Sequence, residues 1–147
     1  MSKDLFDDIH HIALVVYDAN KTASHFEKIG LGPWQDYPPM TQYKNVTGIN
    51  VDDLVDIKFK VLDLGKIHIQ LCQPGTGDSP QKRFLELKGE GVFHISFSVA
   101  DIDVADSQAH ALGLQLLMSG RRDDGNGFSF FDTQGNCAGI NLAIRST

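Results

Sequence analysis

Long apolar runs, basic clusters and cysteines are all scarce in this sequence of 147 residues. The longest apolar run is far shorter than the roughly 20 residues that a membrane-spanning helix needs. The N-terminus MSKDLFDD lacks the apolar region of a signal peptide. No Lys/Arg cluster is longer than RR and the net charge is −6, so nucleic acid and anionic membranes are poor partners. The sequence predicts a cytoplasmic protein with neither partner.

The two cysteines, Cys72 and Cys137, are far apart and belong to no metal-spaced motif. This spacing predicts free thiols rather than a disulfide. With 41% hydrophobic residues, a chain of this length can bury a hydrophobic core without the support of disulfide bonds. We therefore expect one domain over 1–147.

An internal repeat organises the chain. At an offset of 83, HIALVVYDANKTASHFEKIGLG (11–32) aligns without a gap with HISFSVADIDVADSQAHALGLQ (94–115), and six of the 22 positions are identical. Chance would give about one or two identities at ordinary residue frequencies. The chain therefore contains a duplicated unit, over about 9–72 and 92–145.

Each copy is predicted to form a βαβββ unit. Strands are expected at 9–17, 55–63, 66–72, 92–100, 114–119, 127–132 and 138–145. Helices of about ten residues follow the capping residues Asp18 and Asp101 and end at Gly30 and Gly113. A short helix with Ser79 as its cap and Pro80 at its first position joins the copies. The segment GPWQDYPP is too proline-rich for a central strand.

Alternation along the strands places a histidine and an amide from each copy on one polar face. The first strands contribute His11 and His94, and the last strands contribute Gln70 and Asn141. His10 falls on the core-facing side or at the strand entrance, so His11 is the better candidate for a cavity. Two imidazoles and two amide oxygens make a borderline site for one divalent ion, and the paired positions of His11 and His94 favour it.

Four segments resemble the vicinal oxygen chelate superfamily, which includes glyoxalase I, methylmalonyl-CoA epimerase, extradiol dioxygenases and bleomycin-resistance proteins. They are HIALVVYDANKTASHFEKIGLGPW, KIHIQLCQP, FLELKGEGVFHISFSVADID and FFDTQGNCAGINL. The third resembles the epimerase branch most. The resemblance implies an α+β fold in which two βαβββ modules form a cupped, mostly antiparallel sheet around a central cavity. It also implies a homodimer and one divalent metal ion (Co, Ni, Mn, Zn or Fe).

Carried over by position, the metal ligands are His11, Gln70, His94 and Asn141. Isomerases and epimerases of the family have glutamate at the last position, and this chain has no glutamate after Glu90. Asparagine can coordinate through its carbonyl oxygen but cannot accept a proton, so another base is needed. The counterpart of a second epimerase glutamate lies near Leu54, where Asp53 is the candidate, with a solvated loop carboxylate as the alternative.

The remaining candidates are mainly for the substrate, and one of them, His68, is a candidate for the ion as well. His68 shares the face of Gln70 and is an alternative ligand, a proton shuttle or a structural histidine. Trp34 and Tyr37 could wall the cavity mouth or simply cover the core. Arg121 and Arg122 could bind a carboxylate or phosphate, or lie exposed in a loop.

These features favour a metal-dependent isomerase, epimerase or lyase of the glyoxalase or methylmalonyl-CoA epimerase type, acting through a metal-stabilised enolate of a small-molecule substrate. The missing carboxylate at Asn141 favours the alternative of a small-molecule binding or sequestration protein of the bleomycin-resistance type. A ring-cleaving dioxygenase is a third possibility, but its facial triad needs a carboxylate.

Overall fold

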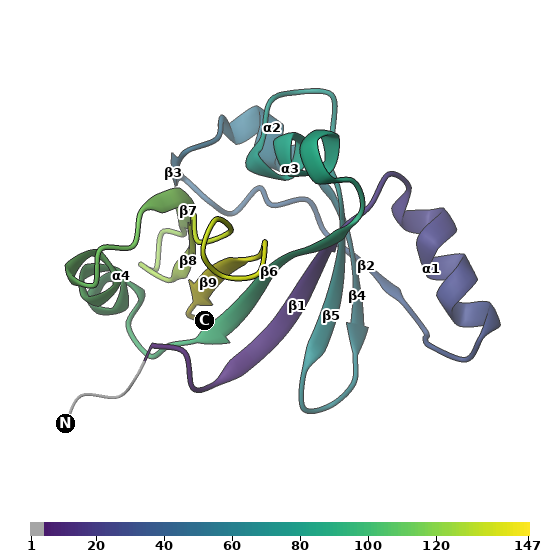
Figure 1. The fold of residues 1–147 in the computed structure, drawn as a ribbon, viewed down its shortest axis with the longest axis horizontal. Coiled ribbons are helices and arrows are strands. Elements are labelled where there is room, and N and C mark those ends of the chain that lie inside the picture. The colour runs from purple at the N-terminus through teal and green to yellow at the C-terminus, as the bar shows by residue number, and fades with distance from the viewer. Residues whose placement is uncertain (1–4) are drawn as a thin grey trace.

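A nine-stranded sheet runs through residues 5–147, which are the residues that the computed structural model describes (Figure 1). The strands are β1 (Ile9–Val15), β2 (Gln35–Tyr37), β3 (Asn45–Thr47), β4 (Lys58–Asp63), β5 (His68–Gln73), β6 (Gly91–Ser98), β7 (Leu116–Arg121), β8 (Gly127–Phe131) and β9 (Asn141–Arg145). Four helices accompany them in this part of the chain: α1 (Ala19–Lys28), α2 (Val51–Val55), α3 (Pro80–Lys88) and α4 (Ile102–Ala111).

The strand order reflects the duplication. It runs β2-β4-β5-β1-β6-β9-β8-β7-β3, and the first strands of the two copies, β1 and β6, pair antiparallel at its centre. Each first strand also pairs in parallel with the last strand of its own copy, β1 with β5 and β6 with β9. The other pairs are antiparallel. The predicted fold of two βαβββ modules in a mostly antiparallel sheet is confirmed.

Local capping fixes the helices where the sequence predicts them. The Asp18 carboxylate accepts a hydrogen bond from the backbone N–H of Lys21 at 3.0 Å, and Asp101 accepts from two backbone N–H groups at the start of α4. Ser79 caps α3 in the same way. Gly30 and Gly113 follow α1 and α4 with φ of 93° and 86°, a backbone conformation that favours glycine.

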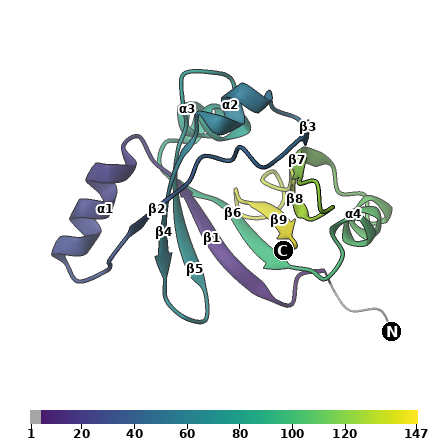
Figure 2. The same ribbon diagram turned by 180° about the vertical axis from the view of Figure 1, so that it is seen from behind.

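Helices cover the sheet at three places. Helix α1 contacts β4 and β5, α4 contacts β8 and β9, and α3 contacts β1 and β6. Figures 1 and 2 show α1 and α4 at opposite ends of the molecule, with α2 and α3 side by side between them. None of the helices formed by residues 5–147 has the length and apolar character that crossing a membrane requires.

The two faces of the central strands enter different apolar clusters. On β1, Leu14 and its neighbour Val16 pack under α1, whereas Ala13 and Val15 join a cluster on the opposite face that includes Phe93 and residues of β7 and β8. Alternation of side chains along a strand explains this division. The second face also carries the polar groups described below.

Three short elements were not expected from the sequence: β2, β3 and α2. Strand β2 contains part of the proline-rich segment and lies at one edge of the sheet, where missing backbone donors are tolerated. Strand β3 comes from the first copy but pairs with β7 of the second, so no pattern within its own copy could place it. Strand β9 begins at 141 rather than 138 because Ala138 and Gly139 have positive φ.

Both cysteines are free thiols, as predicted. Cys72 lies in the core, and burial raises the pKa of its thiol. Cys137 is partly exposed.

Candidate functional site

A cavity of about 280 Å³ opens on the polar face of the central strands. This volume is near the lower end of the range for ligand pockets, about 300–1,000 Å³. It is lined by His10, His11, Tyr37, Met40, Tyr43, Leu54, Phe59, Val61, His68, Gln70, Cys72, Gln81, His94, Ser96, Met118, Arg122, Gly127, Phe128, Phe130, Arg145 and Ser146. Four of the six histidines of the chain are therefore in its wall.

Two register shifts between β1 and β6 shape this wall. Ile9 pairs with Phe97 and His11 with Ser96, which leaves His10 as an extra residue in β1. A bulge of this kind interrupts the alternation of side chains. His10 consequently lines the cavity beside His11 and does not take the core-facing side, which was one of its two expected positions. A second shift leaves Phe93 as an extra residue in β6, next to His94.

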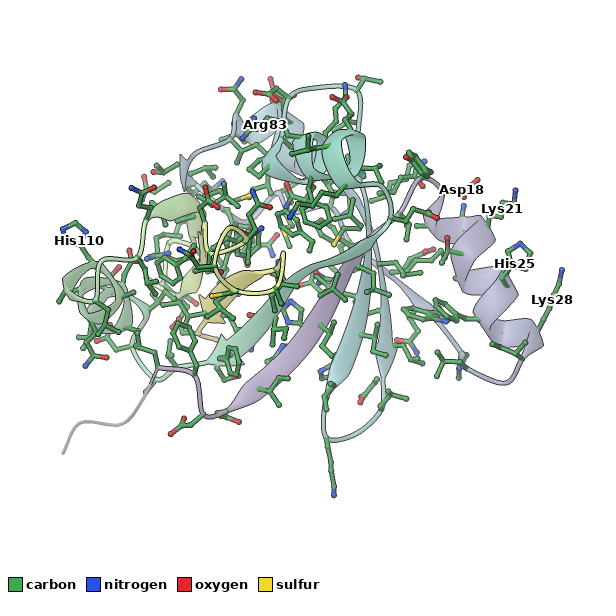
Figure 3. The ribbon with its side chains drawn as sticks, viewed as in Figure 1. Asp18, Lys21, His25, Lys28, Arg83 and His110 are labelled. Atoms are coloured by element: carbon green, nitrogen blue, oxygen red, sulfur yellow. The ribbon has the colours of Figure 1, made fainter. Side chains whose placement is uncertain are left out.

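Three imidazoles form a continuous chain of contacts. His11 Nε2 lies 2.9 Å from His94 Nε2, and His11 Nδ1 lies 2.8 Å from His10 Nδ1. The ring centroids of His10 and His68 are 5.0 Å apart, which adds a fourth imidazole to the row. His25 and His110 are exposed on α1 and α4 and point away from the cavity (Figure 3).

Burial keeps the three contacting imidazoles neutral. Desolvation lowers the pKa of His94 from 6.5 to about 3. The pKa of His10 falls to about 4, mainly through desolvation and then through the charge of Arg145. The pKa of His11 is also well below 6.5, because of burial and then the neighbouring His94. A neutral imidazole has one N–H and one lone pair, so each nitrogen pair shares a single proton.

The strand register places the predicted ligands in two adjacent rows. One row across β5, β1, β6 and β9 holds Gln70, Ala13, His94 and Asn141. The next row holds His68, His11, Ser96 and Ala143. Small residues at Ala13 and Ala143 leave room between the polar side chains. His11 thus pairs with His68 as His94 pairs with Asn141, so His68, rather than Gln70, is the structural counterpart of Asn141.

Several polar atoms near these rows are buried without a hydrogen-bond partner among the described residues. They are Nδ1 of His68 and His94, Oγ of Ser96, Oε1 of Gln81, and both Oδ1 and Nδ2 of Asn141. Asn141 is only 1% exposed. Buried polar groups are rarely left unpaired, because each one costs about 1–3 kcal/mol. These atoms are therefore available to hydrogen-bond to a bound group or to buried water.

The two Nε2 atoms of His11 and His94 are spaced as two ligands of one divalent ion would be. Nitrogens that bind one ion at about 2.0–2.1 Å lie roughly 3 Å apart, close to the observed separation of the two Nε2 atoms. The Nδ1 contact from His11 to His10 matches the outer hydrogen bond that fixes the tautomer of a metal-bound histidine. Within residues 5–147 no three His, Cys, Asp or Glu side chains are grouped to hold a metal, so the donors would be two imidazoles and two amides.

His68 has a different environment from the other three cavity histidines. Its Nε2 lies 3.5 Å from the carboxylate of Asp63, while its Nδ1 is one of the buried atoms without a partner. A carboxylate next to one imidazole nitrogen fixes the tautomer and leaves the other nitrogen free to accept a proton. His68 lies in the cavity wall, where each of the three roles that the sequence left open is compatible with its position.

Four candidates from the sequence lie outside the cavity wall: Asn141, which is buried in β9 in register with His94, and Asp53, Trp34 and Arg121. Asp53 is not in the lining, and its carboxylate lies against the backbone of Gly77 and near Asn50; its neighbour Leu54 faces the cavity instead. Trp34 packs under α1, where its indole stacks on Phe26.

Arg121 points away from the cavity. Its guanidinium contacts Asp103 and Asp106, and it also donates to Ser129 and to two backbone carbonyls. Arg122, the next residue, lines the cavity. Because neighbouring residues in an extended segment face opposite ways, only one of the two arginines can reach it.

Tyr37 lines the cavity, as one reading of the sequence expected, together with Tyr43 and Arg145, which sequence reasoning missed. Arg145 follows the alternation of β9: Asn141, Ala143 and Arg145 share one face. The same alternation that places Asn141 on the polar face of this strand also places Arg145 there.

A two-module sheet with a histidine-lined cavity at its centre defines the class of this protein. The family model for the Glyoxalase/Bleomycin resistance protein/Dioxygenase superfamily matches residues 10–131. The chain belongs to this superfamily, as its motifs indicated.

Solved structures share the fold. The methylmalonyl-CoA epimerase from Mycobacterium tuberculosis has a TM-score of 0.68 at 19% identity, over 99% of this chain and 91% of that one. A variant of the Streptomyces coelicolor epimerase in complex with 2-nitronate-propionyl-CoA has a TM-score of 0.66 at 21% identity, over 95% and 96%. The hypothetical protein BH1468 from Bacillus halodurans C-125 has a TM-score of 0.67 at 19% identity, over 95% and 93%.

Among curated proteins, the uncharacterized protein YqjC of Bacillus subtilis (strain 168) is 30% identical over 81 residues, or 50% of this chain. The match spans 56% of that relative's length.

The lowered pKa values predict acid-sensitive stability. Since the unfolded chain binds protons near pH 6.5 and the folded chain does so only near pH 3–4, the unfolding free energy should fall as the pH is lowered from 6.5. Urea unfolding at pH 7.5 and 5.5, with a chelator present, measures this loss. His94→Gln should reduce the pH dependence and His25→Ala should not. Equal stability of the unmodified protein at the two pH values would contradict the prediction.

Proposed function

We propose that this protein catalyses proton transfer at the carbon next to a carbonyl group of a small molecule, as an isomerase, epimerase or lyase that depends on a divalent ion. The observation that carries the proposal is the 2.9 Å contact between His11 Nε2 and His94 Nε2 in the cavity wall. The proposed ligands are His11, His94, Gln70 and Asn141. When bound, such an ion polarises a carbonyl oxygen and stabilises negative charge there.

The neutral imidazoles support this role. Metal ligation requires deprotonated nitrogens, and desolvation keeps His11 and His94 neutral well below pH 7. His10 would accept the N–H at Nδ1 of His11 and so hold the His11 ring with its Nε2 facing His94. When an ion binds, the proton between the two Nε2 atoms would move to the unpartnered Nδ1 of His94, so both rings would stay neutral without a net loss of a proton. The epimerases that share the fold support the reaction class.

His68 is the residue that we propose to move the proton. The Asp63 carboxylate lies 3.5 Å from His68 Nε2 and favours a proton on that nitrogen, which would leave the unpartnered Nδ1 to take a proton from the substrate and return it. Asparagine at 141 cannot do this, and Asp53 lies outside the cavity wall. The aromatic rings of Phe128 and Phe130 would exclude water from the reacting carbon.

Metal binding tests the ligand set. Calorimetry with Co²⁺, Ni²⁺, Mn²⁺ and Zn²⁺ should detect about one ion per chain for at least one metal. His11→Ala and His94→Ala should each weaken binding at least tenfold, and the exposed His25→Ala should leave it unchanged. Asn141→Glu should strengthen binding, because it adds a negative charge to a neutral donor set. A chain that binds none of these ions would refute the metal-dependent function.

Proton exchange tests the role of His68. The metal-loaded protein should exchange the α-proton of methylmalonyl-CoA, or of the methylglyoxal–glutathione hemithioacetal, with D₂O, measured by proton NMR. His68→Gln should lower the exchange rate about 10²–10⁴-fold while about one ion still binds. If His68→Gln also loses the ion, His68 is a ligand and not the proton-transfer group. His110→Gln is the matched control and should exchange at the normal rate.

A specific observation favours a second candidate, a binding protein without turnover. No Asp or Glu is among the described residues that line the cavity, so carboxylate chemistry is not available there. This candidate predicts that the protein binds an apolar ligand, detected as a rise in melting temperature, with no metal response and no α-proton exchange.

A further inference from the structure

The charge in the cavity wall is opposite in sign to that of the whole chain. The chain carries a net charge of −6, yet the charged side chains among the described lining residues are two arginines, Arg122 and Arg145. Burial keeps three histidines beside them, His10, His11 and His94, neutral. The cavity is therefore a locally positive site, and one that a cationic ligand would enter at a cost.

Arg145 is the less satisfied of the two arginines. It is partly buried in β9, and its guanidinium makes no hydrogen bond or ion pair with the side chains of residues 5–147. Its charge lowers the pKa of both His10 and His11, which places it within electrostatic reach of the histidine row. Removing a cation from water without a partner is unfavourable.

The other three arginines of the chain each have an acidic partner. Arg121 contacts Asp103 and Asp106. Arg83, which is labelled in Figure 3, pairs with Asp78 at 2.7 Å. Arg122 lies 3.5 Å from the exposed Asp124. Arg145 alone among the arginines of the described chain has no acidic partner within contact distance.

The remaining wall is apolar. The rings of Phe128 and Phe130 are in contact at 4.8 Å between centroids, tilted by 34°, and Met118 lines the same cavity. A ligand that fills this space would have an apolar body and one anionic end. Guanidinium groups bind carboxylates through two parallel hydrogen bonds, which gives both affinity and orientation.

We propose that the cavity binds a small carboxylate whose carboxyl group is held by Arg145, with Arg122 second, and whose body packs against Phe128, Phe130 and Met118. This inference deepens the proposed function by naming its substrate class. Arg145 would act as a specificity-determining residue that orients the ligand toward the histidines and supplies no proton. The negative charge missing from the ligand set at Asn141 would then come from the substrate itself.

Three probes of one shape test the proposal: phenylacetate, its neutral amide phenylacetamide, and the cation 2-phenylethylamine. Titrations followed by NMR, with a chelator present so that no ion contributes, should show that phenylacetate binds about tenfold or more tightly than the amide. The amine should not bind. Arg145→Gln should reduce the preference for the carboxylate to less than twofold, Arg145→Lys should retain part of it, and the surface variant Arg83→Gln should retain all of it.

Equal binding of the carboxylate and the amide, or an unchanged preference in Arg145→Gln, would overturn the proposal. If Arg145→Gln does not fold, the probe series on the unmodified protein and on Arg145→Lys still decides it.

Calorimetry with Co²⁺ separates this inference from the proposed function. Loss of the carboxylate preference in Arg145→Gln with ion binding intact supports both. A carboxylate preference in a protein that binds no ion retains the inference and refutes the metal-dependent function.

Discussion

The contact between His11 and His94 depends on how the two copies of the repeat pair. Their first strands, β1 and β6, lie antiparallel at the centre of the sheet, so equivalent residues of the two copies approach each other there. The Nε2 atoms of His11 and His94 lie 2.9 Å apart, and burial keeps both imidazole rings neutral. Two facing lone pairs at this distance need a shared proton or a shared cation. The cavity and its candidate chemistry are built around that requirement.

Much of the fold follows from local rules that the sequence displays. Asp18 and Asp101 cap helices at equivalent points of the two copies, and Gly30 and Gly113 end them, so the repeat and the capping residues predict most elements. The failures have physical causes. The bulge at His10 depends on the partner strand, and strict alternation cannot anticipate it. The pairing of β3 with the opposite copy is a tertiary effect that has no signature in its own three residues.

The site itself was less predictable than the fold, because it depends on which face each side chain finally occupies. His11, His94 and Gln70 could be assigned to the cavity by parity, and all three line it. Asp53 was a candidate only as the counterpart of an epimerase glutamate, and its neighbour Leu54 is the residue that lines the cavity. Trp34 covers the core under α1, which was one of its two expected positions. The neutral donor set and the unpaired Arg145 belong together, since both leave the cavity short of negative charge that a ligand can provide.

Nitrogen-15 NMR of the imidazole rings during a zinc titration tests the shared position of His11 and His94 most directly. If one ion lies between them, the Nε2 resonances of both residues should shift together and saturate at one equivalent of zinc, while those of the exposed His25 and His110 stay in place. Shifts confined to one of the two cavity residues, or shared equally by the exposed histidines, would contradict the site.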